Sequence, residues 1–193
     1  KAFTAQITGQ KNVTCNGLTN GEFTITATNF DTTKGYQYSL DNGTTWSTAL
    51  TTSPYTITGL APNTYTVAIR PVGSTVTACT KTFPPITTTQ PAPIVVTATA
   101  SPATCSTGAK ITTTATGGTP AYQYKLHQVI AGVEAATPVV AFNNNPEFND
   151  IDPGDYRIYV RDANGCATTV GFPITVTAPP ALTAALATTT DYC

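Results

Sequence analysis

The stretch Leu60-Ala61-Pro62-Asn63-Thr64-Tyr65-Thr66-Val67-Ala68-Ile69-Arg70 decides the fold of this chain. Its Pro-Asn pair is a turn signal. After the turn, Tyr65, Val67 and Ile69 alternate with small or polar residues, the period of two that is typical of a strand with one buried face. The stretch therefore predicts a turn that leads into a half-buried β-strand.

A second copy of this stretch returns as Ile151-Asp152-Pro153-Gly154-Asp155-Tyr156-Arg157-Ile158-Tyr159-Val160-Arg161. Apolar residue, Pro, turn, Tyr and alternating strand follow in the same order, and both copies end in Arg. A Tyr just after a turn into a strand, with its ring inside and its hydroxyl on a nearby backbone group, is the tyrosine corner of Ig-like sandwiches. We expect Tyr65 and Tyr156 to form such corners.

The duplication predicts an all-β chain of two tandem Ig-like antiparallel β-sandwich domains. The repeat is about 88–90 residues long, measured from Cys15 to Cys105 to Cys193. We expect the first repeat in residues 1–90, the second in 91–178, and the opening strand of a third in 179–193, which indicates a piece of a longer array. Short strands at regular turn spacing are typical of a sandwich. The strands expected in the first repeat are residues 3–8, 21–28, 36–40, 44–47, 55–58, 64–70 and 80–88, and the second repeat follows the same plan.

Composition excludes several classes of function. Charged residues make up 10% of the chain and the net charge is −1, against a usual charged share of about 25%. Neither nucleic acid nor an anionic membrane surface is therefore an expected partner. The sequence has no Met and no apolar run long enough to cross a membrane, and we expect it to be a mature or excised piece without its signal peptide. Threonine, about a fifth of the residues by count, suits solvent-facing strand positions.

Five cysteines without a Cys-x-x-Cys pair indicate disulfides in an oxidising, extracellular compartment rather than a zinc site. Three pairings remain open. The first lies within each repeat, Cys15–Cys79 and Cys105–Cys166, with Cys193 bonded elsewhere. The second is Cys15–Cys166. The third joins successive cysteines, Cys79–Cys105 and Cys166–Cys193.

Several motifs of the second repeat resemble the SprB-type repeat, an Ig-like module of giant surface adhesins in gliding Bacteroidota. They are Gly117-Gly118-Thr119-Pro120-Ala121-Tyr122-Gln123-Tyr124, Pro153-Gly154-Asp155-Tyr156 and Asp162-Ala163-Asn164-Gly165-Cys166. The first repeat departs from them, with Ala78-Cys79 where the second has Gly165-Cys166. The resemblance implies export by type IX secretion and display as a stalk at the cell surface, attached to the outer membrane, in adhesion or gliding.

Candidate ligand sites each have a simpler structural interpretation. An aromatic platform for a sugar would use Trp46, Tyr55, Tyr36 and Tyr38, although core packing is the favoured role of these rings. A Ca²⁺ site would use acidic residues of the second repeat, but no Asp-rich calcium loop is present, and a solvated rim is favoured. The acidic residues are Glu147, Asp150, Asp152, Asp155 and Asp162.

Modification sites are also suggested. Asp31-Thr32-Thr33 fits the Asp-Thr-small pattern of bacterial O-glycosylation that the resemblance implies, with Thr32 as the acceptor. Asn12-Val13-Thr14 and Asn42-Gly43-Thr44 match the N-glycosylation sequon, a tripeptide that arises often by chance in a Thr-rich chain.

Catalysis has little support, because the single histidine, His127, falls on the outward side of its strand and no cofactor motif is present. We therefore expect no enzyme and no cofactor, but stalk or spacer repeats of a large secreted or cell-surface adhesin. The expected partners are neighbouring repeats and surface glycans or proteins. The alternatives are a glycan- or protein-binding Ig-like module and an accessory spacer of a secreted enzyme.

Overall fold

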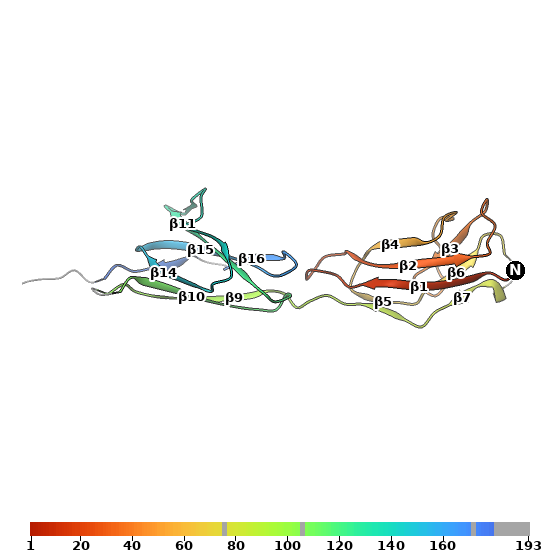
Figure 1. Ribbon diagram of the computed structural model, residues 1–193, viewed down its shortest axis with the longest axis horizontal. Helices are drawn as coiled ribbons and strands as arrows, with labels where there is room; N and C mark the ends of the chain where they lie inside the picture. The colour runs from red at the N-terminus through yellow and green to blue at the C-terminus, as the bar shows by residue number, and fades with distance from the viewer. Residues whose placement is uncertain (75–76, 105–106, 171–172, 180–193) are drawn as a thin grey trace, which may run out of the picture. The chain divides into compact units, whose positions relative to one another are not determined.

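The computed structural model describes residues 1–74, 77–104, 107–170 and 173–179 (Figure 1). The chain divides into two compact units, with the boundary between Pro93 and Ile94. Residues Gly117–Thr119 group with the first unit, because Gly118 N–H donates to the carbonyl of Ala92 in the linker at 2.8 Å. Within the described ranges, no helix is long and apolar enough to cross a membrane. The expected opening strand of a third repeat falls in residues 179–193, of which only 179 is described.

Unit 1 is an antiparallel sandwich whose strands form the sheets β1-β2-β4 and β3-β6-β7 and the pair β5-β8. A single 3₁₀ turn, η1 (Thr77–Cys79), precedes β7. The strands are β1 (Thr4–Lys11), β2 (Gly21–Thr28), β3 (Tyr36–Ser39), β4 (Tyr55–Leu60), β5 (Asn63–Tyr65), β6 (Ala68–Pro71), β7 (Lys81–Thr82) and β8 (Ile86–Thr88).

Unit 2 repeats this plan, with β11 and β15 longer than their counterparts β3 and β6. The sheet β14-β10-β9 faces a sheet of order β12-β11-β15-β16, in which β13 also pairs with β11 and β17 with β15. The strands are β9 (Val95–Ser101), β10 (Ala109–Thr116), β11 (Gln123–Ile130), β12 (Val133–Glu134), β13 (Val140–Asn143), β14 (Glu147–Ile151), β15 (Gly154–Arg161), β16 (Ala167–Thr169) and β17 (Ile174–Val176).

Three predicted strands of unit 1 differ from the structure. Residues 80–88 form two strands, β7 and β8, which pair with β6 and β5. Residues 64–70 are split into β5 and β6, which pair with different partners, whereas the copy in unit 2 is the continuous β15. Residues 44–47 form no strand. Asp41 draws this segment into a turn, since its carboxylate accepts hydrogen bonds from both the N–H and the hydroxyl of Thr45.

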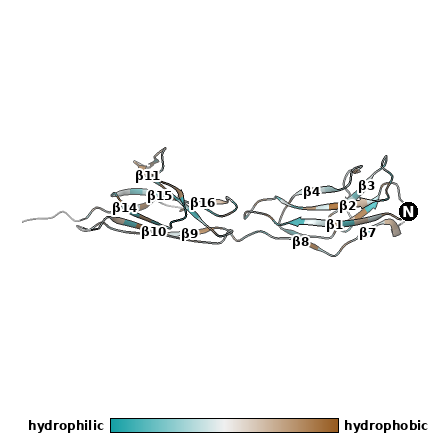
Figure 2. Ribbon diagram, in the orientation of Figure 1, coloured by the Kyte–Doolittle hydropathy of each residue, from teal (hydrophilic) through white to brown (hydrophobic). Residues whose placement is uncertain are grey.

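Each unit has its own hydrophobic core, built from the inward residues of both sheets. In unit 1, Phe23 and Ile25 of β2 pack with Tyr36 and Ile69, all fully buried. The core of unit 2 comprises Ala109, Ile111, Tyr124, Leu126, Phe148, Ile151, Tyr156, Ile158, Val160 and Val176. Hydrophobic and hydrophilic residues are interleaved along the strands (Figure 2), as expected where one strand face is buried.

Outward threonines bond to one another across neighbouring strands. The hydroxyls of Thr4 and Thr28 lie 2.6 Å apart, and those of Thr24 and Thr56 lie 2.9 Å apart. Threonine pairs across strands stabilise a sheet by fractions of a kcal/mol each, about 0.2–1. The threonine-rich faces therefore support the sheets without using charge.

Both repeated tyrosines reach back to the turn that precedes them. Tyr65 Oη donates to the Ala61 carbonyl at 2.8 Å, and Tyr156 Oη donates to the Asp152 carbonyl at 2.9 Å, four residues upstream in each case. Tyr156 is 2% exposed, and its burial raises the pKa of its phenol. Each hydroxyl ties the strand after the turn, β5 in unit 1 and β15 in unit 2, back to the turn that leaves the opposite sheet, which is the geometry of a tyrosine corner.

Replacing Tyr65 by Phe is expected to destabilise unit 1 by roughly 1 kcal/mol, because a protein hydrogen bond is lost while the ring remains. Trp46, the single tryptophan, reports on this unit in urea denaturation followed by fluorescence. Tyr55→Phe is the matched control, since the Tyr55 hydroxyl has no hydrogen-bond partner within the described part of the chain. If Tyr65→Phe and Tyr55→Phe shifted the midpoint of urea unfolding equally, the hydrogen bond of Tyr65 would have no stabilising role.

The turn after β3 is fixed by Asp41 and the buried Ser39. Ser39 Oγ donates to Asp41 Oδ1 at 2.6 Å, and Thr45 donates to the same carboxylate through its N–H at 2.8 Å and its hydroxyl at 2.6 Å. The Ser39 hydroxyl, followed by those two Thr45 donors, lowers the pKa of Asp41 from 3.8 to about 2. The ionised carboxylate therefore stabilises this turn.

This lowered pKa predicts a stability loss in acid. A carboxyl group whose pKa is depressed in the folded state contributes stability above its unfolded pKa, and that contribution disappears as the pH falls through the folded pKa. The stability difference between the native chain and Asp41→Asn should be constant near neutral pH and shrink between pH 3.8 and about 2. A carboxyl NMR titration of Asp41 with an ordinary midpoint would contradict this account.

Candidate functional site

A group of charged and aromatic side chains in mutual contact lies on the outer face of the larger sheet of unit 2. Strand register places Gln123 opposite Arg161, Lys125 opposite Tyr159, and His127 opposite Arg157. Alternation turns these residues away from the core residues between them. We call this group the cationic face; it comprises Gln123, Lys125, His127, Glu134, Phe142, Arg157, Tyr159 and Arg161.

At one end of the cationic face, two cations share the ring of Phe142. The guanidinium carbon of Arg161 lies 4.2 Å from the ring centroid, and Lys125 Nζ lies 5.1 Å from it. Lys125 Nζ also lies 4.4 Å from the ring centroid of Tyr159. Arg161 Nε donates to Gln123 Oε1 at 2.8 Å. Stacking and hydrogen bonding thus hold both cations in place.

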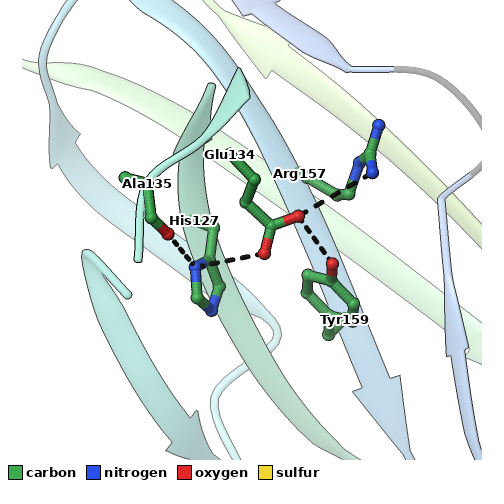
Figure 3. A network of polar contacts seen from close by, with 5 residues as sticks. All are labelled: His127, Glu134, Ala135, Arg157 and Tyr159. Atoms are coloured by element: carbon green, nitrogen blue, oxygen red, sulfur yellow. Dashed lines mark hydrogen bonds and ion pairs between the residues drawn. The ribbon is translucent and has the colours of Figure 1, made fainter. Parts of the chain in front are cut away.

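At the other end, the Glu134 carboxylate gathers three neighbours (Figure 3). Tyr159 Oη donates to Glu134 Oε2 at 2.6 Å, and Arg157 Nη1 lies 3.8 Å from the same oxygen. His127 Nδ1 lies 3.3 Å from Glu134 Oε1 and 2.9 Å from the Ala135 carbonyl. The hydrogen bond to the carboxylate, together with desolvation, raises the pKa of the Tyr159 phenol.

His127 lies on the outward side of β11, as the alternation predicts, yet it is only 6% exposed. The Tyr159 ring packs against it in a T-shaped arrangement, with ring centroids 5.5 Å apart. Both neighbours of Nδ1 are acceptors, so these contacts assign the proton to Nδ1. Nε2 is buried without a hydrogen-bond partner among the described residues. His127 is thus a packed member of the face with its second nitrogen enclosed.

Unit 1 carries a reduced version of the same face. Gln37 and Arg70 are register partners, as Gln123 and Arg161 are. Arg70 donates to Gln37 Oε1 through Nε and Nη2, and its guanidinium lies 3.9 Å from the Trp46 ring centroid.

The other positions of the cationic face are not conserved between the units. Ser39 and Ala68 stand in register where unit 2 has Lys125 and Tyr159. Asp41 and Thr66 form a β-bridge in unit 1 at the positions where unit 2 has His127 opposite Arg157. The Gln–Arg–aromatic group is therefore common to both units, and the remaining cations belong to unit 2.

A groove of about 390 Å³ adjoins Arg161. The side chains of Gln123, Asn144 and Arg161 line it, together with the small residues Ala121, Ala163 and Gly165 and with Asp162. Asp162 is 4% exposed, and its Oδ1 accepts from the N–H groups of Asn164 and Cys166 at 2.9 Å each. The groove thus offers amide and guanidinium donors, while its one carboxylate is held by the loop.

The residues of the predicted aromatic platform are not brought together on one surface. Tyr36 is fully buried and donates to the Thr52 carbonyl at 3.0 Å. Tyr38 and Tyr55 stack 6.2 Å apart and pack against the core of unit 1. The ring of Trp46 instead stacks with the guanidinium group of Arg70. Three of the four rings have the packing role that the sequence favoured.

Three of the five acidic residues considered for Ca²⁺ have local partners for their carboxylates. Glu147 pairs with Lys110 at 2.7 Å, Asp155 accepts from the Thr175 hydroxyl at 2.6 Å, and Asp162 caps its own loop. Asp150 adopts a positive φ of 56°, and the backbone carbonyl of Asp152 holds the corner tyrosine. The described residues contain no group of three or more His, Cys, Asp or Glu side chains arranged to hold a metal ion.

The modification motifs differ in accessibility. Thr32 is exposed, beside an Asp31 carboxylate that accepts from the N–H of Thr33 at 2.9 Å and from its hydroxyl at 2.6 Å. These bonds to Thr33 lower the pKa of Asp31. Asn12 is engaged through Oδ1, which accepts from Thr89 N–H at 3.0 Å, and Asn42 sits at a positive φ of 58° in its turn.

The cysteines correct the first interpretation of the disulfides. Cys15 and Cys166 are each disulfide-bonded, whereas Cys79 is a free thiol. The predicted pairings Cys15–Cys79 and Cys79–Cys105 are therefore wrong. Cys79 is the last residue of η1, just before β7. The loop with Cys15 instead follows β1 and bonds to the linker, so the two cysteines belong to different segments of unit 1. Cys105 and Cys193 lie outside the described residues.

Cys15 and Cys166 are each bonded while Cys79 is free, and the pairing Cys15–Cys166 stays a prediction from the sequence. Peptide mapping after non-reducing digestion should therefore recover Cys15 linked to Cys166. It should also find Cys79 alkylated without prior reduction. Recovery of any peptide that links Cys79 would contradict this expectation.

The sequence interpretation missed the cationic face, although it noted the two signals that define it. Both repeated stretches end in Arg, at Arg70 and Arg161, and Gln precedes the last Tyr in both aromatic strands. The aromatic partners, Trp46 and Phe142, come from loops or hairpins that differ between the units. Connecting each Arg with its Gln and its aromatic ring requires the pairing of strands that are far apart in the sequence.

Comparisons with known proteins leave the family open. No family profile matches the chain, and no curated protein matches it. Among solved structures, the C-terminal 282-residue fragment of intimin, solved with the intimin-binding domain of its translocated receptor, has a TM-score of 0.39 and 13% identity. That match covers 89% of this chain and 64% of the intimin fragment.

A second solved structure, the fibronectin(III)-like modules of CbhA from Clostridium thermocellum, has a TM-score of 0.34 and 21% identity, over 91% of this chain and 95% of that one. TM-scores this low carry no functional argument. The Ig-like sandwich of this chain stands on its own strand order and core.

Proposed function

We propose that the two units are stalk or spacer repeats of a large secreted or cell-surface adhesin. The observation that carries the proposal is the internal duplication: two units share one strand plan, and each has a separate core and a tyrosine corner. Repeated units of this kind add length without requiring new contacts. The bonded cysteines indicate an oxidising compartment.

The linker supports a spacer role because its first residues are tied to unit 1. Val13 N–H donates to the Thr89 carbonyl at 2.9 Å, Gly17 N–H to Gln90 Oε1 at 2.7 Å, and Asn16 Nδ2 to the Pro91 carbonyl at 3.1 Å. The prolines at 91 and 93 stiffen the remainder. The chain thus leaves unit 1 along a fixed path.

The motifs of the second unit that resemble the SprB-type repeat make the proposal more specific. On that basis the parent protein is a surface adhesin of a gliding bacterium, exported by type IX secretion, and its repeats serve adhesion or movement. The role is non-catalytic. The second candidate function, ligand binding by one unit, is favoured by the charge of the cationic face.

Module replacement in the parent protein tests the spacer role. Both units are exchanged for an unrelated pair of Ig-like domains of equal length, and surface display is checked with an antibody against another part of the protein. A spacer predicts that adhesion to a surface is retained after the exchange and falls when the two units are deleted. Loss of adhesion after the exchange, with display unchanged, would contradict the spacer role.

A further inference from the structure

We propose that the cationic face of unit 2 binds an acidic polysaccharide through its carboxylate groups. The face holds three cations, Lys125, Arg157 and Arg161, and one carboxylate, Glu134, which lies 3.8 Å from Arg157. These are three of the nine Lys and Arg residues in a chain of net charge −1. The face is therefore locally positive although the net charge of the whole chain is −1, and it suits an anionic ligand.

The cations are already fixed before any ligand arrives. Arg161 is stacked on Phe142 and bonded to Gln123, and Lys125 lies against the rings of Phe142 and Tyr159. Side chains held in this way lose less conformational entropy on binding. Only Nε of Arg161 has a hydrogen-bond partner within the described ranges, which leaves its terminal nitrogens as donors for a carboxylate.

Unit 1 shows that the fold does not require these charges. At the register positions of Lys125, Tyr159 and Arg157, unit 1 has Ser39, Ala68 and Thr66, and its sandwich is complete. Stabilisation of the sheet alone therefore does not account for them. The extra cations mark unit 2 as the binding unit.

The groove beside Arg161 favours a sugar over a protein segment. Its volume of about 390 Å³ is lined by the amides of Gln123 and Asn144, the Arg161 guanidinium and small residues. Amides and a guanidinium suit hydroxyl and carboxylate groups, whereas protein interfaces are usually anchored by buried apolar or aromatic residues. A chain of uronic acids could place one sugar in this groove and further carboxylates along Lys125 and Arg157.

Calorimetric titration of the intact chain with an oligogalacturonate tests the proposal. We expect Arg161→Gln to weaken binding about tenfold, the usual effect of one lost charged hydrogen bond. We expect a similar loss for the double variant Lys125→Ser/Arg157→Thr, which copies the residues of unit 1. The double variant retains the stack of Arg161 on Phe142. It therefore still tests the proposal if the Arg161→Gln variant does not fold. Raised ionic strength should also weaken binding.

Arg70→Gln in unit 1 is the matched control and should leave the affinity unchanged. A neutral malto-oligosaccharide of equal length should not bind. The proposal is overturned by absent binding of oligogalacturonate, by equal binding of the neutral sugar, or by an equal loss with Arg70→Gln. Equal binding of a polyglutamate peptide would overturn it in favour of an acidic protein partner. Because this assay uses the isolated chain, its outcome is independent of the spacer test.

Discussion

The hydroxyl of the corner tyrosine is the constraint on which each unit depends. It bonds the strand that follows the turn, β5 in unit 1 and β15 in unit 2, to a carbonyl four residues back, in the turn that leaves the opposite sheet. Once that turn is fixed, the register of β6 or β15 with its neighbours follows, and so does the alternation that puts Ile69 or Ile158 inside and Arg70 or Arg157 outside. The duplication preserves this bond although most other residues differ.

Threonine and charge have separate roles on these sandwiches. Paired threonine hydroxyls cover the outer face of the β1-β2-β4 sheet, where they satisfy polar groups at little electrostatic cost. Charge is instead concentrated on one face of unit 2, where cations alternate with aromatic rings and a single glutamate. Such a division allows one repeat of a spacer to acquire a recognition surface while its neighbour keeps only the Gln–Arg–aromatic group. Ser39 and Thr66 in unit 1 show the neutral alternative at equivalent positions.

Local patterns in the sequence predicted the sandwich well, because alternation is a property of consecutive residues. Gly21–Thr28 was predicted as a strand with the same bounds that the structure has, and Tyr65 and Tyr156 stand where the repeated turns require them. Features that depend on distant pairs were not predicted. The break between β5 and β6, the free thiol of Cys79 and the stacking of Arg161 on Phe142 each depend on which segments meet in space. Asp41 shows the same limit, since its bonds to Thr45 replaced an expected strand with a turn.

Native-state hydrogen exchange of the intact chain, measured across low denaturant concentrations, tests most directly whether each unit is stabilised by its own corner and core. The account predicts two groups of slowly exchanging amides, one in the strands before Pro93 and one in the strands after Ile94, each with its own opening free energy and denaturant dependence. A single shared opening free energy and denaturant dependence for the amides of β2 and β15 would show one cooperative core and contradict the account.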